Sequence, residues 1–83
     1  MIRILNYVTG EVAETKDEFS LEAQIKAIKE VIKRNIDSHF KYFSNDKFDL
    51  KIEAYNPEVQ LELEMYIDKS YARRQKFEEK KRA

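Results

Sequence analysis

Few side chains in this 83-residue sequence could perform chemistry on a substrate. There is one histidine, His39, and there is no cysteine. Nucleophilic or hydrolytic catalysis needs an activated nucleophile beside a base. His39 instead falls near the end of an apolar helical stripe, where we expect its ring to pack against Phe43 or an adjacent strand. The serines fall at expected helix ends and turns, where their hydroxyls bond backbone groups. We therefore predict that the protein is not an enzyme.

Metal and cofactor sites are not expected either. With one histidine and no cysteine, only carboxylates remain as metal ligands, and these suit hard cations. The acidic stretch NDKFDLKIE, residues 45–53, lacks the turn glycine of a calcium-binding loop and falls on an expected strand. A single glycine in the chain excludes a glycine-rich phosphate loop. The sequence thus points to binding rather than to catalysis.

Charge is divided unevenly along the chain, although the totals balance. Sixteen lysine and arginine residues match sixteen aspartate and glutamate residues. Residues 48–68 hold six acidic side chains and one lysine, and residues 69–83 hold seven basic and two acidic side chains. An acidic segment is therefore followed directly by a basic one, and each is a candidate contact surface.

The acidic segment is expected to form one face of a β-hairpin. Six side chains on or beside that face are candidate partner-binding residues: Asp49, Glu53, Tyr55, Glu62, Glu64 and Tyr66. Asp49 is expected opposite Glu64, and like charges in that position cost stability. Two interpretations stay open. The face is either solvated, with charges that prevent edge-to-edge aggregation, or it is an acidic docking surface bordered by two tyrosines.

The basic segment, which ends in YARRQKFEEKKRA, is expected to be helical. Its candidate residues for binding a partner protein or a nucleic acid are Arg73, Arg74, Lys76, Lys80, Lys81 and Arg82. The segment is compatible with a solvated, partly docked helix, with contact to phosphates through counterion release, or with contact to an acidic protein surface. The negative balance of the rest of the chain disfavours nucleic acid, and no RNA- or DNA-binding signature is present.

The elements that position these residues begin with a hairpin at the N-terminus. Gly10 supplies the left-handed conformation that closes a loop over residues 7–10. The register then places Arg3 opposite Glu14, and it pairs Ile4 and Leu5 with apolar residues of the second strand. A helix follows from Ser20, or from Thr15 with Glu18 as a capping box. Its apolar stripe runs from Leu21 to Phe43 at steps of three and four, and SNDK, residues 44–47, ends it.

Strict alternation then predicts a second hairpin between residues 48 and 67. Apolar side chains recur at every second position from Phe48 to Ala54, and again from Val59 to Ile67. The dipeptide Asn56–Pro57 between them favours a four-residue loop over residues 55–58. Because the apolar face must be covered, we expect it to pack on the long helix.

These elements predict an α+β fold. An antiparallel sheet from two β-hairpins, in the order ββαββα, packs on one long amphipathic helix, and a short basic C-terminal helix follows. Residues 1–67 form a single domain in this prediction, and residues 68–83 form a basic helix or tail. The order of the strands in the sheet is left undetermined.

The function that the sequence favours is a small non-enzymatic protein-binding module. It would be a regulator or inhibitor that docks on a larger protein through charged sheet and tail surfaces. A homodimer is compatible with this hypothesis, because the acidic hairpin of one copy can meet the basic tail of another. The alternative is a small nucleic-acid-binding protein that uses the basic helix. A composition rich in Lys, Ile, Asn and Glu suits an AT-rich bacterial or phage genome.

The expected location is the cytoplasm, without membrane contact. The apolar run in the N-terminal stretch MIRILNYV is too short for a signal peptide, and no small-residue cleavage site follows it. No apolar run approaches the roughly 20 residues of a membrane span.

Overall fold

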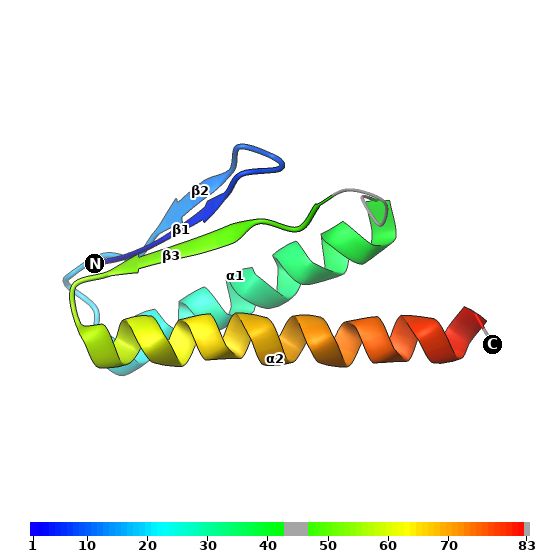
Figure 1. Ribbon diagram of the computed structural model, residues 1–83. Coiled ribbons are helices and arrows are strands. Elements are labelled where there is room, and N and C mark those ends of the chain that lie inside the picture. The colour runs from blue at the N-terminus through cyan, green and yellow to red at the C-terminus, as the bar shows by residue number, and fades with distance from the viewer. Residues whose placement is uncertain (43–46, 83) are drawn as a thin grey trace.

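A computed structural model describes residues 1–42 and 47–82 of the chain, with the side chain of residue 82 left out. It has two layers, an antiparallel sheet of three strands and a pair of helices beneath it (Figure 1). The elements in chain order are β1 (Ile2–Asn6), β2 (Val12–Glu14), α1 (Leu21–Tyr42), β3 (Leu50–Ala54) and α2 (Pro57–Arg82). The α+β class and the antiparallel sheet are therefore confirmed, but the order is ββαβα.

The N-terminal hairpin has the predicted register. Arg3 pairs with Glu14, Ile4 with Ala13 and Leu5 with Val12. The amide of Gly10 donates to the Asn6 carbonyl at 2.8 Å, and Gly10 has φ of 80°. Only glycine adopts that backbone region at little cost, which explains the loop position.

The helix α1 follows its predicted apolar stripe. Ile28, Ile32 and Ile36 are buried, and the side chain of Ile32 has no exposed surface. Ser20 is the N-cap, because its hydroxyl oxygen accepts from the Ala23 amide at 3.2 Å. The predicted end of this helix at Phe43 and SNDK lies outside the described residues.

The strand β3 does not pair with a following strand as predicted. It pairs antiparallel with β1, with Ile4 opposite Ile52, so the sheet order is β2-β1-β3. Long-range pairing of this kind leaves no local signal, because β1 and β3 are separated by the whole of α1. The predicted second hairpin is therefore wrong beyond its first strand.

Residues 59–67, predicted as a strand, belong to the helix α2. Asn56 caps this helix, since its side-chain oxygen accepts from the Glu58 amide at 2.9 Å, and Pro57 occupies the first helical position. Proline suits that position because its φ is already helical and its missing N–H needs no partner. The dipeptide that favoured a hairpin loop is thus a helix start. The predicted boundary at residues 67/68 falls inside α2.

The apolar residues of this segment fit both the two-residue period of a strand and the four-residue step of a helix. The chain adopts the helix. Val59, Leu63 and Ile67 recur every four residues and are buried. Leu61 and Met65, which the alternation would also bury, are 60% and 47% exposed. Glu, Leu, Gln and Met are also better helix formers than strand formers.

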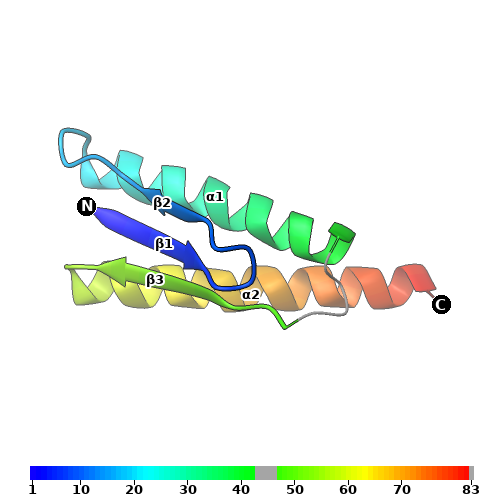
Figure 2. The same ribbon diagram turned by 90° about the horizontal axis from the view of Figure 1, so that it is seen from above.

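The two helices lie side by side and run in the same direction (Figure 2). They can do so because β3, which connects them along the chain, runs in the opposite direction. β3 packs on α2 and β1 on α1. All elements except β2 contribute buried residues to one apolar core: Ile2, Ile4, Ile28, Ile32, Ile36, Ile52, Val59, Leu63 and Ile67. No described element covers the opposite face of the sheet.

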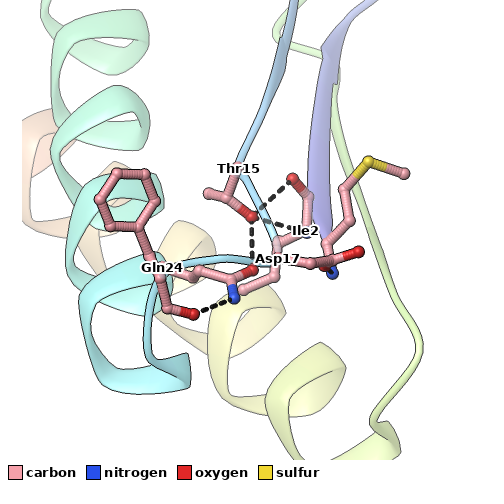
Figure 3. Close-up of polar contacts among 6 residues, drawn as sticks. Ile2, Thr15, Asp17 and Gln24 are labelled. Carbon is pink, nitrogen blue, oxygen red and sulfur yellow. Dashed lines mark hydrogen bonds and ion pairs between the residues drawn. The ribbon is translucent and has the colours of Figure 1, made fainter.

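A polar network fastens the loop after β2 to the first turn of α1 (Figure 3). The Thr15 hydroxyl accepts from the Ile2 amide at 2.8 Å and donates to the Gln24 side-chain oxygen at 2.7 Å. The Gln24 amide group then donates to the Phe19 carbonyl at 2.9 Å. Thr15 therefore holds the sheet to α1 instead of starting a capping box. The ammonium group of Met1 adds an ion pair with Asp17.

Candidate functional site

A groove lies between α1 and α2 in the half of the molecule where these helices end. It is open to solvent and has a volume of about 750 Å³. The side chains on its walls that matter for binding are four cations and two aromatic residues: Lys33, Lys69, Arg73, Arg74, Tyr66 and Phe77. We call this hollow the basic groove.

Arg74 fastens the two walls of the groove together. Its guanidinium donates to Asp37 of α1 at 2.7 Å and to Glu78 of α2 at 2.8 Å. The hydrogen bond from Arg74 is the main cause that lowers the pKa of Asp37. The bonds to Asp37 and Glu78 raise the pKa of Arg74. The positive charge of Arg74 is thus balanced by two carboxylates of the protein itself.

The other three cations of the groove keep their charge exposed. Lys33, Lys69 and Arg73 are exposed, and none of them forms an ion pair with a described residue. They come from both helices, since Lys33 lies on α1 and the other two lie on α2. Three cations without internal partners beside one hollow produce a positive potential there, and this attracts anionic groups.

Aromatic rings form part of the groove surface. Tyr66 is half-buried, and the Lys29 ammonium lies 5.2 Å from the centre of its ring while pairing with Glu62 at 3.2 Å. Phe77 is 57% exposed at the open end. The groove therefore combines unpaired cations with an exposed ring, which suits a ligand that is both anionic and apolar.

The predicted basic residues are brought together only in part. Arg73, Lys76 and Lys80 follow each other at steps of three and four, which places them on one face of α2. Lys69, which was not among the predicted residues, continues that face four residues before Arg73. Arg74 faces Asp37 on α1 instead, and the Lys81 ammonium lies 5.8 Å from the centre of the Phe77 ring. The Arg82 side chain lies outside the described part of the structure.

The predicted acidic face does not exist as one surface. Asp49, Glu53 and Tyr55 lie on or beside β3, whereas Glu62, Glu64 and Tyr66 lie on α2. Glu53 pairs with Arg3 at 3.8 Å on the outer side of the sheet, and Tyr55 is 89% exposed at the turn before α2. The expected cross-strand pairs between residues 49–51 and 62–64 are absent because residues 62–64 are helical.

Of the cations and aromatic residues of the basic groove, three were not among the predicted site residues: Lys33, Lys69 and Phe77. Lys33 follows the stripe residue Ile32 directly, so its position beside the apolar seam was visible in the sequence. Its partner helix was not visible, because α2 was predicted to begin only at residue 68. Phe77 lies on α2 and lines the groove.

His39 is part of an aromatic cluster where α1 ends. It is buried, and its ring centre lies 5.2 Å from that of Phe40 and 5.1 Å from that of Phe48, in edge-on contacts. Tyr71 of α2 stacks on Phe48 at 4.7 Å. The expected contact of His39 with Phe43 lies outside the described residues, and Phe48 belongs to the segment before β3 rather than to a strand. This cluster joins α1, the segment before β3, and α2.

No group of three or more His, Asp or Glu side chains that could hold a metal ion occurs within residues 1–42 and 47–82. Neither described helix combines the length and apolar character that crossing a bilayer requires.

The chain matches no protein-family model, no curated protein and no solved structure. Its function must therefore be inferred from the geometry of its own surface.

Proposed function

We propose that the protein is a non-enzymatic protein-binding module that holds an acidic segment of a larger protein in the basic groove. The observation that carries this proposal is the placement of three exposed cations without internal ion pairs, Lys33, Lys69 and Arg73, around one hollow with an exposed phenylalanine. In this role the chain acts as a small regulator or inhibitor of the protein on which it docks.

The chemistry of the groove defines the partner segment. Aspartate or glutamate side chains would neutralise the cations, and an apolar side chain would cover Phe77. Aromatic and arginine residues are the types that most often carry binding energy at interfaces. A volume of about 750 Å³ accommodates a few side chains rather than a folded element. Both walls are helices of the packed fold, so little ordering is needed on binding.

The proposal is tested with labelled acidic peptides. Fluorescence anisotropy would measure the binding of peptides that contain Asp or Glu around one Leu or Phe, with neutral peptides of the same length for comparison. We expect the acidic peptides to bind, and the double variant Lys33→Glu, Arg73→Glu to lose about tenfold or more in affinity, which corresponds to about 1.4 kcal/mol.

A matched control separates the groove from overall charge. The variant Lys16→Glu, Lys51→Glu changes the net charge by the same amount at two exposed lysines away from the groove. We expect its affinity for the acidic peptides to stay close to that of the original protein. An equal loss in both variants, or no binding of any acidic peptide, would contradict the proposal.

A second candidate function, nucleic-acid binding, is favoured by one observation. Lys69, Arg73, Lys76 and Lys80 form a straight line of exposed cations on α2, and such a line releases counterions from a phosphate backbone. Against it, Glu58 and Glu62 extend the same face towards the start of α2. A long nucleic acid that followed this face would therefore meet negative charge.

Titration of labelled single- and double-stranded oligonucleotides at several salt concentrations decides between the two functions. If the line of cations binds phosphates, the affinity falls steeply with salt. The variant Lys76→Ala, Lys80→Ala then reduces the slope by about 0.9 for each lost contact. Oligonucleotide binding together with failure of the acidic peptides would establish this second function in place of the first.

A further inference from the structure

An exposed line of charges runs along the flank of α2 beside the basic groove. Glu62 pairs there with Lys29 of α1, and Lys69 lines the groove. Neither contact accounts for the pattern as a whole. Glu58, Glu62, Lys69, Lys76 and Lys80 follow each other at steps of four and seven residues, so they form one line along the helix. All five are exposed. The buried residues Val59, Leu63 and Ile67 lie on another side.

The division between the two charges is sharp. Residues 57–68 hold four acidic and no basic side chains, and residues 69–82 hold seven basic and two acidic ones. The helix dipole favours acidic residues in the first turn and basic residues in the last turn only. It does not account for a reversal of charge in the middle of a helix of 26 residues.

Apolar side chains accompany this line of charges. Leu61 and Met65 are 60% and 47% exposed in the acidic half. Ala72 lies seven residues after Met65, on the same face in the basic half, and it is also exposed. A small residue at this place allows another helix to approach closely.

We infer that α2 is the contact surface between two copies of this chain, with the two α2 helices antiparallel. A twofold axis between residues 68 and 69 places Met65 of one copy against Ala72 of the other. The same axis sets Glu62 opposite the turn that holds Lys76, and Glu58 opposite the turn that holds Glu79 and Lys80. A parallel arrangement would set like charges against each other, so charge complementarity selects the antiparallel one.

This pairing goes beyond the proposed function. Lys33, Arg73 and Phe77, which line the basic groove, do not belong to the line of charges, whereas Lys69 belongs to both surfaces. α2 also lies at the border of the fold and extends past the end of α1, as Figures 1 and 2 show. A second helix can therefore lie along α2 without moving α1 or the sheet.

Charge reversal tests the pairing. One variant carries Glu58→Lys and Glu62→Lys, and the other carries Lys76→Glu and Lys80→Glu. Sedimentation velocity at low ionic strength should show a dimer for the original protein, monomers for each variant alone, and a dimer again for the mixture of both variants. Recovery in the mixture shows that each variant is folded. A monomeric original protein, reversed variants that self-associate as the original does, or a monomeric mixture would overturn the inference.

Disulfide trapping tests the direction of the helices independently of the charges. The chain has no cysteine, so the variants Met65→Cys and Ala72→Cys each introduce a single thiol. Under mild oxidation we expect the mixture to form the disulfide between Cys at 65 and Cys at 72, because the antiparallel arrangement brings their Cβ atoms close. Disulfides only between identical variants would indicate parallel helices and overturn the inference.

The two proposals can fail separately. The variant Lys76→Glu, Lys80→Glu retains Lys33, Lys69 and Arg73, so we expect its monomer to bind the acidic peptides. Loss of the dimer with retained peptide binding would leave the proposed function intact, and a dimer that binds no acidic peptide would leave the α2 pairing intact.

Discussion

At the scale of single residues, the side chain of Gln60 hydrogen-bonds backbone groups on the edge of β3 that does not pair with β1. Its side-chain oxygen accepts from the Ala54 amide at 2.8 Å, and its side-chain nitrogen donates to the Ile52 carbonyl at 2.7 Å. One amide thus takes the place that a peptide group of a neighbouring strand would take. Exposed strand edges otherwise pair with other chains, so this contact protects the sheet as well as joining it to α2.

Removing that amide should cost stability. We expect Gln60→Ala to lower the free energy of unfolding by about 1–3 kcal/mol, because two backbone groups lose their partner. Urea unfolding followed by circular dichroism measures this change. The control is Gln75→Ala on the exposed side of the same helix, for which we expect a change within about 0.5 kcal/mol. Equal losses in the free energy of unfolding at both positions would show that the hydrogen bonds of Gln60 to β3 do not stabilise the fold.

At the scale of elements, α2 shows how one sequence can satisfy two periods. The side chains of Val59, Leu63 and Ile67 fit both the alternation of a strand and a four-residue helical step. The two states differ only at Leu61 and Met65, which a strand would bury and the helix exposes. The helix N-cap at Asn56 and the pairing of β3 with β1 decide in favour of the helix.

A pair of substitutions distinguishes the helix from the predicted strand. We expect Leu63→Asp to unfold the protein, because its fully buried side chain would become an unpaired charge in the core. Leu61→Asp should change the free energy of unfolding by no more than about 0.5 kcal/mol. Thermal unfolding at high ionic strength measures both. In a strand the two side chains would share one face, so similar destabilisation by both would contradict the helical assignment.

At the scale of the whole molecule, the ends of the two helices are held together by polar and aromatic contacts beyond the aliphatic core. The ion pair between Asp37 and Arg74 joins α1 to α2 at 2.7 Å. The rings of Phe40, Phe48 and Tyr71 join the same helices to the segment before β3. Asp37 and Arg74 also line the basic groove, so the stability of this end and the shape of the groove are connected.

The Asp37–Arg74 pair predicts a pH dependence of stability. Because Arg74 lowers the pKa of Asp37 below its ordinary value of 3.8, the folded state favours the ionised carboxylate. The stabilisation is complete above the unfolded pKa and is lost as the pH falls through the lowered, folded pKa. Asp37 is exposed, so the effect is small.

The comparison with Asp37→Asn isolates this contribution from the other carboxylates. We expect the original protein to be more stable than the variant near neutral pH, and the difference to disappear at a pH below the lowered pKa of Asp37. Urea unfolding of both proteins across the acidic range measures it. A stability difference that stays constant through this range would mean that the ion pair does not stabilise the fold.

Local signals in the sequence determined the first half of the fold. The loop glycine and the facing apolar residues specify the register of β1 and β2, because these strands are neighbours in the chain. The stripe through Ile25, Ile28 and Ile32 specifies α1, because the step of three from Ile25 to Ile28 does not fit the alternation of a strand. The charge reversal at residue 69 was likewise visible in the sequence, since it depends on composition alone.

Tertiary structure alone decided the second half and the candidate site. The alternation over residues 59–67 fits a strand or a helix, and the choice rests on contacts with α1 and β3 that local patterns do not contain. The basic groove unites Lys33 with Arg73 from two helices that lie side by side only because β3 returns to β1. Spacing along a chain determines which side chains share a face of one element, whereas packing between elements determines which faces meet.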